Sequence, residues 1–173
     1  GIFTARKTRL PASQVDSRLV PIKGDEEWTN TYNAFAAEAE AQKSSIDGTE
    51  KMWIINYKKR LLEASKIKNA ISEARRALRA ERWPIIFVET KAERSIDIQE
   101  LRLQEQFKRA KAIAERTGGD RPKRSDYKGL LSDGIINVLE ATMERIGTTV
   151  ISIPSAEDVI KNEIGANDVA IFT

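Results

Sequence analysis

The chain has 173 residues, of which 40% are hydrophobic and 32% charged, a composition typical of globular proteins, and its length fits one domain with an appendage or one medium-sized domain. It contains no cysteine and no histidine, which excludes disulfides, zinc–thiolate sites, iron–sulfur clusters and histidine-based catalytic triads. No apolar run reaches the ~18 residues of a membrane helix, and the first residues lack the pattern of a signal peptide, so we expect a protein of the cytoplasm or of a particle assembled there.

The formal net charge of +3 is unevenly distributed. Residues 1–24 carry five basic and one acidic side chain, residues 25–50 one and seven, and residues 51–82 ten and three. The acidic segment is therefore expected to pack antiparallel against the basic one.

Residues 1–24 are predicted to form an extended arm, followed by a helical hairpin at 25–82 and a small α/β unit at 83–173. Pro11 and Pro21 block a continuous helix in the arm, and Gly24 closes it. Its scattered apolar residues have little capacity to fold by themselves. We expect the arm to lie on another surface, such as a neighbouring subunit.

The hairpin is predicted from two amphipathic helices, at about 26–42 and 49–82. Asp25 is the expected N-cap of the first, and Asp47 with Glu50 forms a capping box for the second. The first apolar stripe contains Trp28, Tyr32, Phe35 and Ala39. The second contains Ile54, Tyr57, Leu61, Ala64, Ile67, Ile71, Ala74 and Leu78. Because the rest of the long helix is charged or polar, we expect other copies or subunits to help cover its stripe.

The pattern changes after Trp83-Pro84. The run of β-branched and apolar residues at 85–88 predicts a strand that is buried on both faces. Helices are expected at about 97–117, 126–146 and 155–164, with a possible interruption of the second at Asp133-Gly134, and further strands at 148–153 and 169–172. This order favours a helix-rich α/β fold in which helices pack on a three-stranded parallel sheet.

One tripeptide, at residues 89–91, carries side chains that can serve in metal-dependent catalysis. Glu89-Thr90-Lys91 follows the first strand, and its alternation places Glu89 and Lys91 on one face. It resembles the second half of the PD-(D/E)XK nuclease signature, which implies a Mg²⁺-binding carboxylate and a lysine beside the attacking water. The family also needs an acidic residue on a preceding strand, which this chain lacks. Glu81, Glu93 and Asp97 are candidates for the missing carboxylate, and the simpler alternative is a pair of solvated residues at a strand end.

Basic residues suggest a second alternative, a non-catalytic nucleic-acid-binding module that contacts phosphates through helix 51–82 and a later loop. The residues concerned are Lys58, Lys59, Arg60, Arg75, Arg76, Arg79, Arg121, Lys123 and Arg124. The competing interpretation is a solvated helix surface that the acidic segment balances.

The hypothesis we prefer from sequence is a non-enzymatic structural subunit of a large homo- or hetero-oligomeric assembly, such as a connector-like component of a virus or phage particle. It rests on the arm, on the long amphipathic helix and on the lack of a catalytic constellation. Its partners would be other protein subunits, in the simplest case copies of the same chain, and it would need no cofactor; Mg²⁺ enters only under the nuclease alternative.

Overall fold

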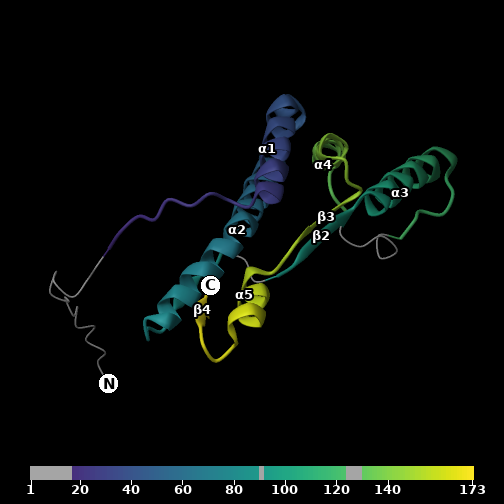
Figure 1. The fold of residues 1–173 in the computed structure, drawn as a ribbon. Coiled ribbons are helices and arrows are strands. Elements are labelled where there is room, and N and C mark those ends of the chain that lie inside the picture. Colours follow the sequence, from purple (N-terminus) through teal and green to yellow (C-terminus); the bar gives the residue numbers. More distant parts are fainter. Residues whose placement is uncertain (1–16, 90–91, 124–129) are drawn as a thin grey trace, which may run out of the picture.

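The computed structural model describes residues 17–89, 92–123 and 130–173 (Figure 1). Most of the predicted arm, residues 1–16, lies outside the described residues. Residues 17–24 have neither helix nor strand, and 17–23 are exposed. The C-terminal end of the arm lies against the long helix. Next to it, the N–H of Asp25 donates to the carbonyl of Ser65 at 2.9 Å. The side-chain amide of Asn69 donates to the carbonyl of Lys23 at 3.2 Å.

The predicted helical hairpin is present. α1 (Glu26–Ala41) begins after the N-cap Asp25, and a 3-10 turn, η2 (Lys43–Ser45), leads to α2 (Gly48–Arg79). Asp47 and Glu50 form the expected capping box, with both of its hydrogen bonds at 2.9 Å. The ion pair between Lys68 and Asp25, at 2.5 Å, joins the basic helix to the acidic segment. This pairing lowers the pKa of Asp25 and raises the pKa of Lys68.

The apolar stripe of α2 is covered within the single chain, so the expectation that other copies or subunits help to cover it is wrong. Seven of its eight predicted members are buried, and Leu78 is half-buried. The N-terminal half of the stripe, including Tyr57 and Leu61, belongs to a core cluster shared with α1 and later elements. The C-terminal half, at Ile67 and Ile71, belongs to a second cluster. One helix therefore supports two separate cores.

The remaining elements follow in chain order as short strands and helices. They are β1 (Ile85–Phe87), β2 (Arg94–Asp97), α3 (Ile98–Thr117), α4 (Asp133–Ile146), β3 (Val150–Ile153), α5 (Ala156–Ile164) and β4 (Ala170–Phe172). The prediction placed the start of α4 too early. Ser132 caps the helix by accepting from the N–H of Ile135 at 3.5 Å, so the expected interruption at Asp133-Gly134 is its first turn.

The three predicted strands exist, but the expected three-stranded parallel sheet is wrong. β1 pairs with β4 in parallel, and β3 pairs antiparallel with β2, a strand that sequence analysis missed. Within β2, Ile96 is buried while Arg94 and Ser95 are not, so the apolar pattern is too short to reveal a strand. Its extended conformation depends on pairing with β3, where Ile96 lies opposite Ile151.

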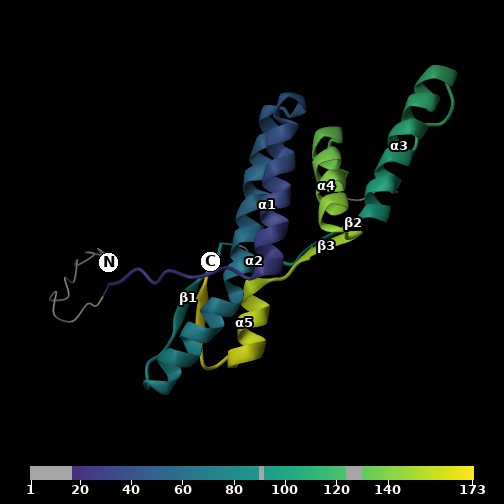
Figure 2. The same cartoon turned by 45° about the horizontal axis from the view of Figure 1, so that its top comes forward.

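Each of the two small sheets packs into one of the two cores, and Figure 2 shows the sheets at different places along α2. α4, β2 and β3 pack with α1 and the N-terminal half of α2, around fully buried residues such as Leu139 and Met143. α5, β1 and β4 pack against the C-terminal half of α2, around Ile160 and Val169. Both views show α5 beside that half of the long helix.

Candidate functional site

Among the residues that the structure describes, one face of the parallel pair β1–β4 is covered and the other is not. Ile86 and Ile171 lie opposite each other and pack into the second core. Ile85, Phe87 and Phe172 alternate with them and therefore lie on the other side. Their exposed fractions are 57%, 78% and 53%, and Trp83, which precedes β1 in the same alternation, is 59% exposed. We call these four residues the open face.

The open face overturns the prediction that residues 85–88 are buried on both sides. Parallel strands in folded proteins are normally covered on both faces, and their continuous apolar runs reflect that environment. Here only Ile86 and the buried Val88 meet the chain's own core. The sequence of this strand is therefore suited to a cover that residues 17–89, 92–123 and 130–173 do not supply.

A groove with a cavity volume of about 340 Å³ borders the open face at Phe87. Its other walls come from α2, through Lys59, Leu62 and Lys66 among others. Leu62 is itself 38% exposed, so apolar surface continues from the sheet onto the helix. The lysines give this edge of the open face a charged rim of the kind that surrounds protein interfaces.

The same groove contains Glu89, the central residue of the nuclease hypothesis. Glu89 is exposed, and its backbone N–H donates to the carboxylate of Glu63 at 3.0 Å. Sequence analysis did not identify Glu63, because nothing in its helical spacing links it to β1. Lys91 lies outside the described residues. Asp97, one of the candidate ligands, caps α3 by accepting from the N–H of Gln99 at 2.6 Å.

Over residues 17–89, 92–123 and 130–173, no group of three or more acidic side chains is placed to hold a metal ion. The nuclease hypothesis thus has Glu89, whose backbone N–H contacts the carboxylate of Glu63, and it stays a prediction.

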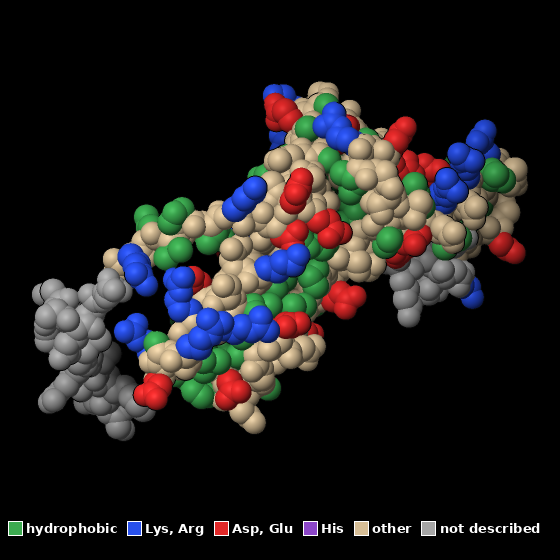
Figure 3. Space-filling view, in the orientation of Figure 1, with side chains coloured by type: hydrophobic (Ala, Val, Ile, Leu, Met, Phe, Trp, Pro, Cys, Tyr) green, Lys and Arg blue, Asp and Glu red, His purple; other side chains and the backbone are tan. Residues whose placement is uncertain are grey.

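The basic residues that were predicted to contact nucleic acid do not form one surface. Arg75, Arg76 and Arg79 lie at the C-terminal end of α2, where Figure 3 shows basic side chains gathered, whereas Arg121 and Lys123 follow α3 at the opposite end of the molecule. Two of the arginines at the end of α2 form ion pairs: Arg75 with Glu163 at 3.0 Å and Arg76 with Glu73 at 3.4 Å.

The other predicted basic residues lie in the middle of α2 or outside the description. Lys58, Lys59 and Arg60 are consecutive, so they point to different sides of the helix, and Arg60 donates to the carbonyl of Ala92 at 3.1 Å. Arg124 lies outside the described residues. Nucleic-acid binding stays a prediction.

Arg94 of β2 and Trp53 and Tyr57 of α2 form a stacked column of side chains that connects the strand to the helix. The guanidinium of Arg94 lies 4.9 Å from the ring centroid of Trp53, and Trp53 stacks on Tyr57 with centroids 4.8 Å apart. Burial, followed by the nearby charge of Arg60, lowers the pKa of Arg94. Burial also raises the pKa of Tyr57 well above its ordinary value, and its hydroxyl has no hydrogen-bond partner among the described residues. The column is structural, because it closes the first core.

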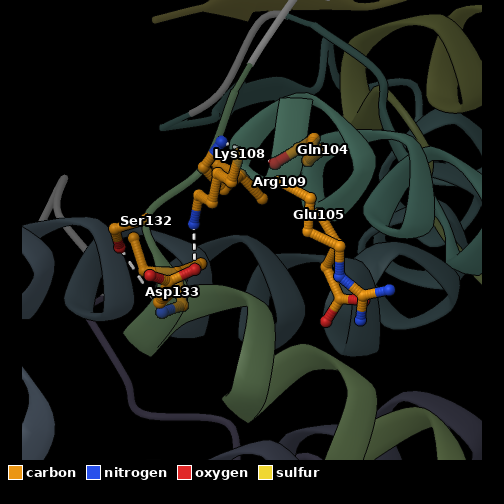
Figure 4. Close-up of polar contacts among 8 residues, drawn as sticks. Gln104, Glu105, Lys108, Arg109, Ser132 and Asp133 are labelled. Carbon is orange, nitrogen blue, oxygen red and sulfur yellow. Dashed lines mark hydrogen bonds and ion pairs between the residues drawn. The ribbon is translucent and has the colours of Figure 1, made fainter. Parts of the chain in front are cut away.

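α3 is held to the start of α4 by polar contacts (Figure 4). The buried amide of Gln104 accepts from the N–H of Leu131 at 2.7 Å, and Lys108 pairs with Asp133. Leu103 and Ile113 on α3 are 52% and 55% exposed. They are ten residues apart on one helix, unlike the adjacent residues of the open face, and they serve as matched controls below.

No family model, curated protein or solved structure matches this chain. None of the helices in the described part of the chain has the length and apolar character needed to span a bilayer. The candidate functions therefore depend on the geometry of the chain itself.

Proposed function

We propose that this chain is a non-enzymatic assembly subunit that binds a second copy of itself through the open face. The observation that carries this proposal is the exposure of Ile85, Phe87 and Phe172 on one side of a parallel strand pair. Water-exposed aromatic rings on such a pair are unfavourable, and burial against another subunit removes them from water. A component of a virus or phage particle is one form that this role can take.

The size of the open face is consistent with part of an interface. Trp83, Phe87 and Phe172 together expose roughly 400 Å² of aromatic surface, taking about 200 Å² for each complete side chain. A stable interface of standard size buries about 800 Å² on each partner. Further apolar surface is available from Leu62 beside the sheet and from the arm, where Leu19 is 100% exposed.

Size-exclusion chromatography with light scattering tests the proposal, using the parent chain and two double variants. The parent is expected to form a defined oligomer at tens of micromolar. Phe87→Ser with Phe172→Ser is expected to be monomeric, because it removes the two rings at the centre of the open face. Leu103→Ser with Ile113→Ser removes similarly exposed residues from α3 and is expected to keep the parent's oligomeric state.

A parent chain that stays monomeric at these concentrations contradicts self-association through the open face. Equal loss of the oligomer in both double variants would assign the association to general hydrophobic attraction. Circular dichroism of each variant checks that the helical fold is retained.

A further inference from the structure

A second concave surface lies between α2 and α5, beside the start of α1, and shares no residue with the open face. Its cavity volume is about 550 Å³, which falls within the ~300–1,000 Å³ of small-molecule sites. The apolar walls come from Trp28 on α1, Ile67 and Ile71 on α2, and Val159 on α5. Ile67 and Ile71 are buried members of the second core, so this part of the groove has a fixed shape.

A polar row runs along the groove beside the apolar residues of α2. Lys68, Ser72, Arg75 and Arg79 line it at spacings of four, three and four residues, which places them on one side of the helix over ~17 Å. In Figure 3, basic side chains lie next to hydrophobic surface over this half of the helix. The groove is therefore elongated, with an apolar side and a cationic side.

The charges in the groove leave one cation in excess. Asp25 pairs with Lys68 at 2.5 Å, and Glu163 pairs with Arg75 at 3.0 Å. These two carboxylates are the acidic groups that line the groove. Arg79, one turn beyond Arg75, has no ion-pair partner among the described residues. An anion placed near Arg75 and Arg79 would complete the charge balance of the groove.

We propose that this groove binds an amphipathic anion, with an apolar chain against Ile67 and Ile71 and a carboxylate or phosphate head group at Arg79. The arm of a second copy is a poorer fit. Although Leu19 of the arm is exposed, Arg18 and Lys23 would bring further positive charge to a cationic rim. The volume of the groove suits a single alkyl chain. The polar residues of the groove lie along one side of the space that this alkyl chain would occupy, and the apolar walls lie along the other.

Isothermal titration calorimetry tests the proposal with dodecanoate and dodecyl phosphate, each below its micelle-forming concentration, and with neutral dodecanol. We expect saturable binding of at least one anion, and the tighter of the two identifies the head group. Arg79→Glu is expected to weaken that binding about tenfold, since it replaces an attraction by a repulsion. Arg76→Glu changes an arginine of the same helical turn that does not line the groove, and it is expected to stay within about twofold of the parent.

A second pair of variants tests occupancy of the groove directly. Ser72→Trp fills the groove from an exposed position of α2 and is expected to abolish binding, whereas Glu73→Trp adds the same side chain outside the groove and is expected to preserve it. Thermal unfolding confirms that both variants fold. The proposal is overturned if neither anion binds saturably, if dodecanol binds as tightly as the anions, if Arg76→Glu weakens binding as much as Arg79→Glu, or if Ser72→Trp binds like the parent.

Discussion

The rings of Phe87 and Phe172 lie opposite each other on neighbouring parallel strands, with centroids 5.8 Å apart, and both are more than half exposed. Two aromatic rings in contact on the surface form a compact apolar patch. Their neighbours Ile86 and Ile171 point into the core and hold the strands on α2 and α5. The two rings therefore lie on strands that are fixed by the second core, but the rings themselves are not part of that core.

The first prediction is that Phe87→Ser with Phe172→Ser leaves the stability of the monomer almost unchanged. The free energy of unfolding should change by less than about 0.5 kcal/mol, because exposed side chains contribute little to the core. Urea unfolding at a dilution where the parent is monomeric measures this change. A loss of about 3 kcal/mol, typical of a buried aromatic residue, would show that the rings belong to the core.

The second prediction is that the two cores open separately. Ile160→Ala in the second cluster and Leu139→Ala in the first should each cost about 3 kcal/mol, because both side chains are almost completely buried. Ile160→Ala should accelerate hydrogen exchange in β1, β4 and α5 while α1 and α4 stay protected. Leu139→Ala should show the reverse pattern. Uniform acceleration in both variants would indicate a single cooperative unit.

The third prediction concerns the buried hydroxyl of Tyr57, which has no hydrogen-bond partner in the described part of the chain. Tyr57→Phe should stabilise the fold by about 1 kcal/mol, since an unsatisfied buried polar group is removed while the stack on Trp53 remains. Thermal and urea unfolding measure the change. Trp53→Phe, which shortens the same stack, should be destabilising, and a destabilised Tyr57→Phe would reveal a hydrogen bond to the hydroxyl.

The fourth prediction is a pH dependence at the contact between α3 and α4. Burial, and then the carboxylate of Glu105, raise the pKa of Glu140 above its ordinary value of 4.5. The folded protein therefore holds this proton more tightly than the unfolded chain. The stabilising effect of protonation is complete below the unfolded pKa and is lost as the pH rises through the folded pKa.

Glu140→Gln should accordingly be more stable than the parent at pH 7, by about 0.5 kcal/mol after solvent screening. The difference should vanish well below pH 4.5, the ordinary pKa of the group, where the parent's Glu140 is itself protonated. Urea unfolding over a pH series measures both points. Glu105→Gln relieves the same repulsion, so the double variant should gain less than the sum of the single changes. A gain that does not depend on pH would assign the effect to packing.

Helix positions could be predicted from the sequence because their signals are local. Asp25 and Asp47 are N-caps in the structure as predicted, Asp97 caps α3 in the same way, and Gly118 ends α3 in the left-handed conformation, with φ 66°. Each signal depends on residues within one turn of the helix end. The start of α4 was misplaced, since no similar signal distinguished Ser132 from the residues before it.

Strand pairing could not be predicted in the same way. β2 carries one buried apolar residue, Ile96, and becomes a strand through contact with β3, which lies more than fifty residues later in the chain. The pairing of β1 with β4 joins residues that are 85 positions apart, as in Ile85 and Ala170. Such contacts depend on how the helices pack between the strands.

The sequence by itself determined the approximate positions of the helices, three of the four strands in the described part of the chain and the absence of thiol and imidazole chemistry, because these follow from local patterns and from composition. Only the tertiary structure decided that α2 is covered by its own chain, that the strands of the described residues form two pairs, and that these residues leave Phe87 and Phe172 exposed. The apolar run at 85–88 predicts a strand that needs cover on both sides. Which side of the strand is buried depends on α2 and α5, because their apolar side chains form the second core with Ile86 and Ile171.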